Sequence, residues 1–133
     1  MRVLIDTDVL LDVALAREPH LPASLAVLEW AEKGGRAAVA WHSLANCSYL
    51  LKGGIVFLKN LLVLVEVAPV GSEEAKVAMG LPMNDLEDAF QAASALAWKA
   101  DFIVTRNLPD YRQSPVPAVS PEDFSRRFRG IGD

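Results

Sequence analysis

The first eight residues constrain the fold of this chain more than any other segment. A short apolar run at residues 3–5 leads directly into Asp6-Thr7-Asp8. Such a run predicts a buried parallel strand that delivers carboxylates to one edge of a sheet, where ligands of open α/β sheets bind. Two carboxylates without a neighbouring Lys or Arg suit a hard cation such as Mg²⁺ or Mn²⁺. The alternative is that they only cap the next helix.

Strand patterns and helix patterns alternate along the chain. We expect strands at residues 3–6, 36–41, 63–67, 102–105 and 115–119, the last at an edge because proline interrupts a ladder. We expect helices at residues 9–16, 21–33, 43–52, 55–62, 72–79 and 84–99, and one that begins at residue 120. This order predicts an α/β fold, a three-layer sandwich with a central, mainly parallel sheet of about four or five strands flanked by helices.

Length and composition predict one globular domain over residues 1–133, since the chain is 52% hydrophobic and 23% charged. The single cysteine, Cys47, excludes an internal disulfide and fits a reducing, cytoplasmic compartment. The longest apolar stretch, residues 61–70, contains Glu66 and is too short to span a membrane. The net charge of −4 disfavours non-specific coating of nucleic acid. It does not exclude a nuclease, because metal-binding acids add negative charge.

A second pair of acids opens the long helix expected at residues 84–99. Asp85 and Asp88 are three positions apart, which places both carboxylates on one face of a helix. Glu87 lies about 160° around the helix from Asp85 and should point elsewhere. Asn84 is the expected cap of this helix. The alternative for the two aspartates is that they only complement the helix dipole.

A third set of oxygen ligands follows the strand expected at residues 102–105. Thr105 ends this strand, and Asn107 and Asp110 come just beyond it. Crossover connections between parallel strands can bring these residues to the same edge as Asp6. Clustered carboxylates without basic partners repel one another, and a divalent cation relieves that repulsion. One or two such metals, with a bound water as the nucleophile, would make a phosphodiester hydrolase.

Four segments, taken in order, resemble the PIN domain family and in particular the VapC-type toxin nucleases. They are residues 4–11 (LIDTDVLL), 85–93 (DLEDAFQAA), 100–111 (ADFIVTRNLPDY) and 114–124 (SPVPAVSPEDF). Each segment is short, but together they are specific and cover nearly the whole chain. The resemblance implies a parallel sheet flanked by helices and metal-dependent cleavage of RNA. It also implies a homodimer and a small antitoxin protein that covers the site.

The resemblance assigns site residues as well. Asp6 corresponds to the first acid of the family, and Asp88 to the acid of its Asp-Ala-x-x-Ala-Ala pattern. Asn107 stands where many members have Asp and is followed by Asp110, whereas Asp8 stands where members more often have Asn. The expected catalytic residues are Asp6, Asp85, Asp88, Asn107 and Asp110, all but the last as ligands of Mg²⁺ or Mn²⁺, supported by Asp8, Asn46 and Thr105.

One position departs from the family pattern. Members usually carry a Glu early in the helix after the second strand, whereas residues 42–49 contain no acid and Asn46 takes that place. Asn can give an oxygen to a metal, but it has no charge and cannot act as a base. A second hypothesis is therefore a PIN fold that binds RNA or a protein without cutting. A remote third is a haloacid-dehalogenase-type phosphatase, which also opens with Asp-x-Asp but continues with a Gly-Thr that is absent here.

Apolar residues also occur outside the predicted core stripes. Val56, Phe57 and Leu58 are examples, and they predict a buried contact surface. Together with the resemblance, this predicts that the protein is a homodimer.

Overall fold

The computed structural model describes residues 1–128 and contains one central sheet. Its five strands have the order β3-β2-β1-β4-β5, and each neighbouring pair is parallel. The strands are β1 (Arg2–Ile5), β2 (Arg36–Val39), β3 (Glu66–Val67), β4 (Phe102–Val104) and β5 (Ala118–Val119). The parallel sheet predicted from the alternation of strands and helices is thereby confirmed.

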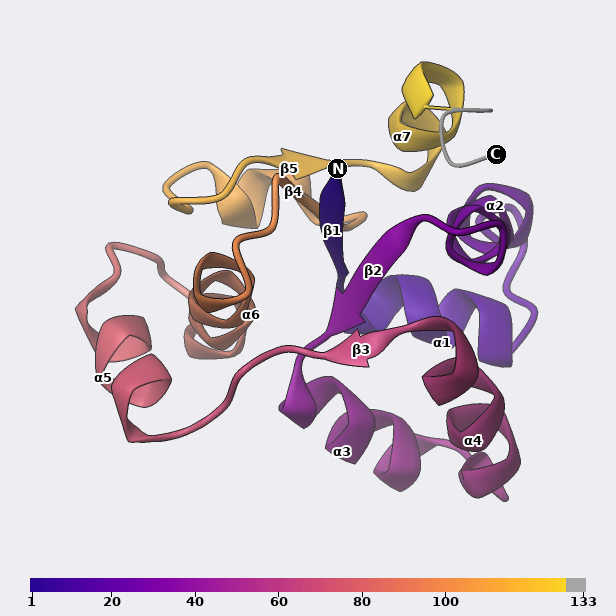
Figure 1. Cartoon of the computed structure of the whole chain (residues 1–133), viewed down its shortest axis with the longest axis horizontal. Coiled ribbons are helices and arrows are strands. Elements are labelled where there is room, and N and C mark those ends of the chain that lie inside the picture. The colour runs from indigo at the N-terminus through magenta and orange to yellow at the C-terminus, as the bar shows by residue number, and fades with distance from the viewer. Residues whose placement is uncertain (129–133) are drawn as a thin grey trace.

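Helices cover both faces of this sheet. Within residues 1–128 they are α1 (Thr7–Ala14), α2 (Leu21–Glu32), α3 (Trp41–Leu50), α4 (Gly54–Leu64), α5 (Ser72–Gly80), α6 (Leu86–Ala97), the 3-10 helix η1 (Leu108–Tyr111) and α7 (Pro121–Phe128). Figure 1 shows α5 and α6 on one side of the sheet, and α1, α2, α4 and α7 on the other. This is the predicted three-layer sandwich. None of the described helices has the length and apolar character needed to cross a membrane.

The central strand supplies side chains to two separate cores. Val3 and Ile5 pack with α1 and α2, whereas Leu4 packs on the opposite face with α6. Successive side chains of a strand point to opposite faces, which explains this division. On α6 the buried contacts include Ala92 and Ala95. Their small side chains let α6 lie close to the sheet, and this position brings its first turn near the end of β1.

The third strand is shorter than the sequence predicts. Residues 63–64 belong to α4, and β3 has only 2 residues. A short apolar run fits either a strand or a helix, and its hydrophobicity alone does not separate them. In the structure Leu61 is buried while Val63 is 82% exposed. The run is therefore part of a helix with one buried face.

An aspartate caps each of two helices, and in both cases the start of the helix differs from the prediction. The carboxylate of Asp6 accepts a hydrogen bond from the backbone N–H of Thr7 at 2.7 Å, so α1 begins directly after the strand instead of at residue 9. At α6 the cap is Asp85 and not Asn84, because Asp85 Oδ1 accepts from the backbone N–H three residues later at 3.0 Å. A capping residue has non-helical backbone angles, so the regular helical angle between successive side chains does not apply to it.

The predicted contact surface is corrected in part. Phe57 and Leu58 are partly buried and pack against the core, so they are not available to a partner. The large exposed apolar residues of α3 and α4 are Trp41, Tyr49, Leu50, Ile55, Val56, Leu62 and Val63. On α4 the helical repeat places Phe57 and Leu58 on the inner face and the exposed residues on the outer face.

Candidate active site

The carboxyl ends of β1 and β4 lie next to each other in the middle of the sheet. The register pairs Ile5 with Val104, so Asp6 and Thr105 follow as neighbours. The Thr105 hydroxyl donates a hydrogen bond to Asp6 Oδ2 at 2.8 Å, and both side chains are buried. Thr105 therefore fixes the orientation of the Asp6 carboxylate.

A buried tyrosine joins Asp6 to the first turn of α6. The Tyr111 hydroxyl lies 3.0 Å from Asp6 Oδ2 and 3.2 Å from Asp88 Oδ1. Burial and the charges of both aspartates raise the pKa of Tyr111, so its hydroxyl keeps its proton. One hydroxyl has one proton to donate and faces two carboxylates. Asp6 and Asp88 are far apart in the sequence, but both carboxylates contact the same hydroxyl group.

These two acids belong to an open hollow of about 450 Å³ at this edge of the sheet. We call it the acidic hollow. Its wall includes Asp6, Asp8, Asn46, Glu87, Asp88 and Asn107. The structure thus brings together residues from the end of β1, from α1, α3 and α6, and from the segment after β4. Five of them are site residues predicted from the sequence, and Glu87 is the addition.

Two further predicted residues lie in a neighbouring hollow. Asp85 and Asp110 line a depression of about 250 Å³ together with Arg112. They act on the acidic hollow through their charge. Burial, together with the negative charges of Asp85, Asp6 and Asp110, raises the pKa of Asp88 to about 6. These two residues therefore stand beside the acidic hollow rather than in it.

Burial and mutual repulsion disfavour the charged forms of the other acids too. Burial raises the pKa of Asp6, although hydrogen bonds from Thr105 and other donors oppose the shift. Burial and the charge of Asp6 raise the pKa of Asp8 to about 7. Asp8 Oδ2 accepts from the backbone N–H of Arg106 at 3.2 Å, but its buried Oδ1 has no hydrogen-bond partner among the described residues. A bound cation would relieve both the repulsion and the unpaired oxygen.

The structure corrects the prediction that Glu87 lies away from the site. Its side chain lines the acidic hollow, and Oε1 accepts a hydrogen bond from Asn46 Nδ2 at 3.1 Å. Glu87 and Asp85 do point apart, as predicted, but Glu87 is the one at the acidic hollow, whereas Asp85 caps α6 and lines the neighbouring hollow. Burial and then the charge of Asp6 raise the pKa of Glu87. A carboxylate therefore stands beside Asn46, the position at which the family pattern places an acid.

A buried polar network fixes the helices that surround these acids. Gln91 is fully buried on α6, and its Nε2 donates to Ser43 Oγ at 2.7 Å and to Thr7 Oγ1 at 3.2 Å. The Ser43 and Thr7 hydroxyls also bond to each other at 2.8 Å. The network joins the first turns of α1 and α3 to α6. A glutamine within an alanine-rich helix was the one sequence signal for it.

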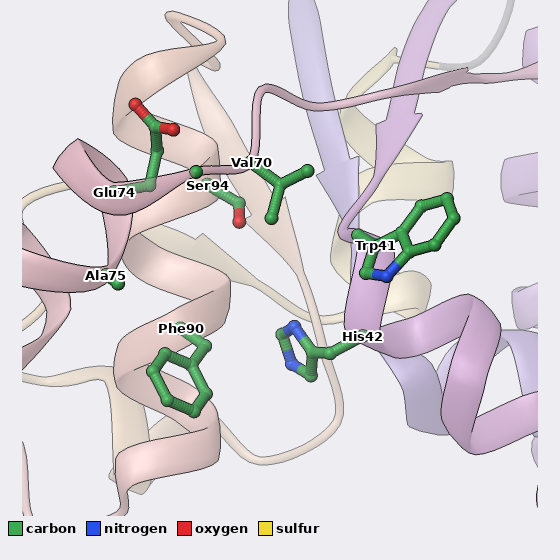
Figure 2. Close-up of a pocket in the computed structure, with 8 residues that line it drawn as sticks. Trp41, His42, Val70, Glu74, Ala75, Phe90 and Ser94 are labelled. Carbon is green, nitrogen blue, oxygen red and sulfur yellow. The ribbon is translucent and has the colours of Figure 1, made fainter.

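A third hollow, of about 210 Å³, is apolar (Figure 2). The rings of His42 and Phe90 meet edge to face across it, with 5.8 Å between their centroids. Trp41 stands at its border and is the first residue of α3, not the end of the second strand as predicted. Burial lowers the pKa of His42, so its ring is neutral at pH 7. This hollow has one acid, Glu74, and is not a metal site of the predicted kind.

The acidic hollow has donors that fit a divalent cation. Within residues 1–128, no group of three or more Asp, Glu, His or Cys side chains is placed so that it could hold a metal ion by itself. Mg²⁺ does not require such a group, because it keeps several waters and binds one or two carboxylates together with substrate phosphates. Asp6 and Asp88, with the unpaired Oδ1 of Asp8 beside them, offer such a set.

Solved structures share this arrangement of strands and helices. One is VapBC2 from Rickettsia felis bound to a promoter DNA fragment, with a TM-score of 0.67 and 18% identity over 90% of this chain and 98% of that chain. A second is VapBC-1 from nontypeable Haemophilus influenzae, with a TM-score of 0.66 and 14% identity over 92% and 99%. A third is FitAB bound to an IR36 DNA fragment, with a TM-score of 0.61 and 17% identity over 90% and 94%. At these identities, the likeness establishes the fold.

The sequence itself matches a family model. The match spans residues 2–109, which is most of the chain, and the model describes the PIN domain. A comparison with curated proteins gives no match. The matched region contains Asp6 and Asp88, and the phosphatase alternative is set aside. The chain belongs to the PIN domain family.

Proposed function

We propose that this protein is a metal-dependent endoribonuclease that cleaves RNA phosphodiester bonds and serves as the toxin of a cytoplasmic toxin–antitoxin pair. PIN domains are typically metal-dependent nucleases, and the solved neighbours are toxin–antitoxin complexes. The observation that carries the proposal is the meeting of Asp6 and Asp88 at the Tyr111 hydroxyl, with Asp8 beside them. Carboxylates held this close repel one another and destabilise the metal-free fold, and a cation bound between them would offset this repulsion.

The proposal gives each residue of the acidic hollow a role. Asp6, Asp8 and Asp88 are the residues that would hold Mg²⁺ or Mn²⁺, with Glu87 and Asn107 on the same wall. When bound, the cation supplies an activated water and offsets the charge that develops on the phosphate. Thr105 and Tyr111 hold the carboxylates in place. Asp85 and Asp110 add negative field from the neighbouring hollow.

RNA cleavage measured against metal concentration tests this function. The wild-type protein is expected to cut a single-stranded oligoribonucleotide in Mg²⁺ or Mn²⁺ and to be inert in a chelator. Asp88→Asn is the matched control, because it removes one ligand charge while keeping the size of the side chain. An oligodeoxyribonucleotide of the same sequence tests the preference for RNA. Cleavage that is undiminished in Asp88→Asn, or wild type that stays inert at millimolar Mn²⁺, would contradict the proposal.

The alternative is a PIN fold that binds RNA or a protein without cutting. It is favoured by one observation, the neutral Asn46 at a position where the family pattern has an acid. The contact between Asn46 and Glu87 weighs against it, because it places a carboxylate at the same wall. If Asn46→Glu cuts RNA while the wild type binds RNA without cutting it, the binding function is the correct one.

The exposed apolar residues of α3 and α4 support a protein partner. Tyr49 is 89% exposed and Leu50 is 57% exposed, and both also line the acidic hollow. Ile55 and Val56 are also exposed, on α4. Large exposed apolar side chains are typical of interaction surfaces. A small antitoxin that covered Tyr49 and Leu50 would also close the acidic hollow, and a second copy of the chain is the other partner that we expect.

A further inference from the structure

A fully paired carboxylate lies behind the acidic hollow. Asp12 of α1 has no exposed surface, and Arg106 donates to it from Nε at 2.7 Å and from Nη2 at 3.1 Å. Arg17 donates from Nε at 3.0 Å, and the Ser24 hydroxyl donates at 3.1 Å. Each oxygen of Asp12 therefore has two donors. This is the arrangement that a buried carboxylate requires if it is to remain charged.

Both arginines reach beyond Asp12 into the wall of the acidic hollow. Their side chains remain 38% exposed at Arg17 and 26% exposed at Arg106. Arg17 also donates from Nη2 to the backbone carbonyl of Asp8 at 3.3 Å. Within residues 1–128, these guanidinium groups form no other side-chain hydrogen bonds than those named here. Each guanidinium has five N–H donors, so both keep donors for a ligand.

The two arginines of this cluster are engaged by its acids to different extents. Asp12 needs one cation for neutrality, and Arg106 already binds it through two hydrogen bonds. The negative charges of Asp8 and then of Glu122 on α7 also act on Arg106. Arg17 is bound to Asp12 through one hydrogen bond and is the less engaged of the two guanidinium groups. It places a fixed positive charge at the rim of a hollow whose charged residues, apart from Arg17 and Arg106, are acids.

We infer that Arg17, aided by Arg106, binds a backbone phosphate of the RNA strand next to the acidic hollow. The inference rests on the proposed nuclease function, and it assigns the contact that holds the substrate. Guanidinium groups match phosphate geometry through paired N–H donors, and a group already fixed by Asp12 loses little freedom on binding. A chain with net charge −4 needs such local contacts, because its overall field repels RNA.

RNA binding without cleavage gives a direct test. The fluorescence anisotropy of a labelled single-stranded oligoribonucleotide is measured in Mg²⁺ with Asp88→Asn protein, in which every further variant is made. Arg17→Gln is expected to weaken the Kd about threefold to tenfold at low salt. It should also reduce the slope of log Kd against log salt by about 0.7, the value for one phosphate contact on a single strand. Arg17→Lys should keep the slope and lose about half of the affinity or more, because lysine keeps the charge without the paired donors.

The matched control is Arg36→Gln. Arg36 is the first residue of β2, at the end of the strands opposite to the acidic hollow. Like Arg17, it pairs with one carboxylate, that of Glu66 at 3.0 Å. Its removal should leave the RNA affinity and the salt slope unchanged. Melting temperatures of all variants establish that they are folded. If Arg17→Gln does not fold, Arg17→Lys decides the question through its lower affinity at an unchanged slope.

The outcomes separate this inference from the proposed function. Equal affinity and equal slope for wild-type Arg17 and its variants overturn the inference and leave the nuclease function to the cleavage assay. An equal loss in Arg36→Gln also overturns it, because the effect would then be one of overall charge. If binding depends on Arg17 but the protein with the native Asp88 never cuts RNA, the phosphate site is supported and the nuclease function is overturned. A protein that neither binds nor cuts RNA overturns both.

Discussion

Asn46 of α3 donates a hydrogen bond to Glu87 of α6, with 3.1 Å between Nδ2 and Oε1. The contact connects two helices that both contribute to the acidic hollow. It places the neutral amide and the carboxylate at one wall, where the family pattern has an acid on the first of these helices. The charge that the sequence lacks at residue 46 is thus present on a neighbouring element.

Substitutions at these two residues should move metal affinity in opposite directions. Affinity of an oxygen site for a dication depends mainly on the charge of its ligands. Asn46→Glu should increase the apparent affinity for Mn²⁺, and Glu87→Gln should decrease it, each by on the order of tenfold. Calorimetric Mn²⁺ titration and RNA cleavage against metal concentration measure both effects. Glu74→Gln, which changes an acid of the apolar hollow, is the control.

The contrary result for these variants is also clear. If wild type and Asn46→Glu respond identically to metal, Asn46 does not act at the site. If only Glu87→Gln is unchanged, its carboxylate serves to hold Asn46 and not to bind the cation. The first result would remove Asn46 from the site, and the second would leave Asp6, Asp8 and Asp88 as the carboxylates that bind the cation.

Removal of the Tyr111 hydroxyl should separate stability from metal binding. Tyr111→Phe deletes the donor between Asp6 and Asp88 but keeps the buried ring. The metal-free protein should lose about 1 kcal/mol of unfolding free energy, because two buried carboxylates lose a shared partner. The rise in melting temperature on adding Mn²⁺ should become larger, because the cation then offsets more repulsion. Tyr49→Phe, at a residue that is 89% exposed, should change neither value.

Stability of the metal-free protein should depend on pH through Asp8 and Asp88. Their pKa values in the folded protein are about 7 and about 6, above the ordinary value of 3.8. Between about pH 4 and pH 7, the folded state therefore binds more protons than the unfolded chain, and their contribution to stability falls as the pH rises. His42 acts in the opposite sense below its ordinary value of 6.5, because its pKa is lowered.

Asp8→Asn isolates this effect. The melting temperature of the variant minus that of the wild type, both in a chelator, should increase from pH 4.5 to pH 8 by several degrees, on the order of 1 kcal/mol. Saturating Mn²⁺ should reverse the order, because the wild type then gains the stability of metal binding. A difference that is constant with pH would mean that Asp8 is charged throughout the range and that its raised pKa is wrong.

The exposed apolar residues of α3 and α4 predict self-association. Sedimentation should give a dimer rather than the 14.4 kDa monomer. Val56→Asp and Val63→Asp, at positions that are 66% and 82% exposed, should shift the protein towards the monomer without lowering its melting temperature. Val77→Asp, on α5 and 41% exposed, is the control on another surface. A clean monomer at high concentration would contradict the homodimer.

The sequence alone determined the layers of this protein and the position of its first acid. Alternating strand and helix patterns required a parallel sheet with helices on both faces, because apolar strands must be covered on both sides. Asp6 follows an apolar strand, so its place at the carboxyl edge was a local property of the chain. The meeting of Asp6 and Thr105 followed from the parallel pairing of β1 with β4.

Only the tertiary structure decided which acids share a hollow. Periodicity correctly separated Glu87 from Asp85, but it did not show that Glu87 faces the acidic hollow while Asp85, the cap of α6, lines the neighbouring one. Asp110 and Tyr111 follow one another in η1, yet only the tyrosine turns inward to Asp6. The course of that short turn depends on the long-range packing of its buried residue, and no local pattern encodes this packing. The chain therefore specified the edge at which the chemistry lies, and the fold selected the residues that meet there.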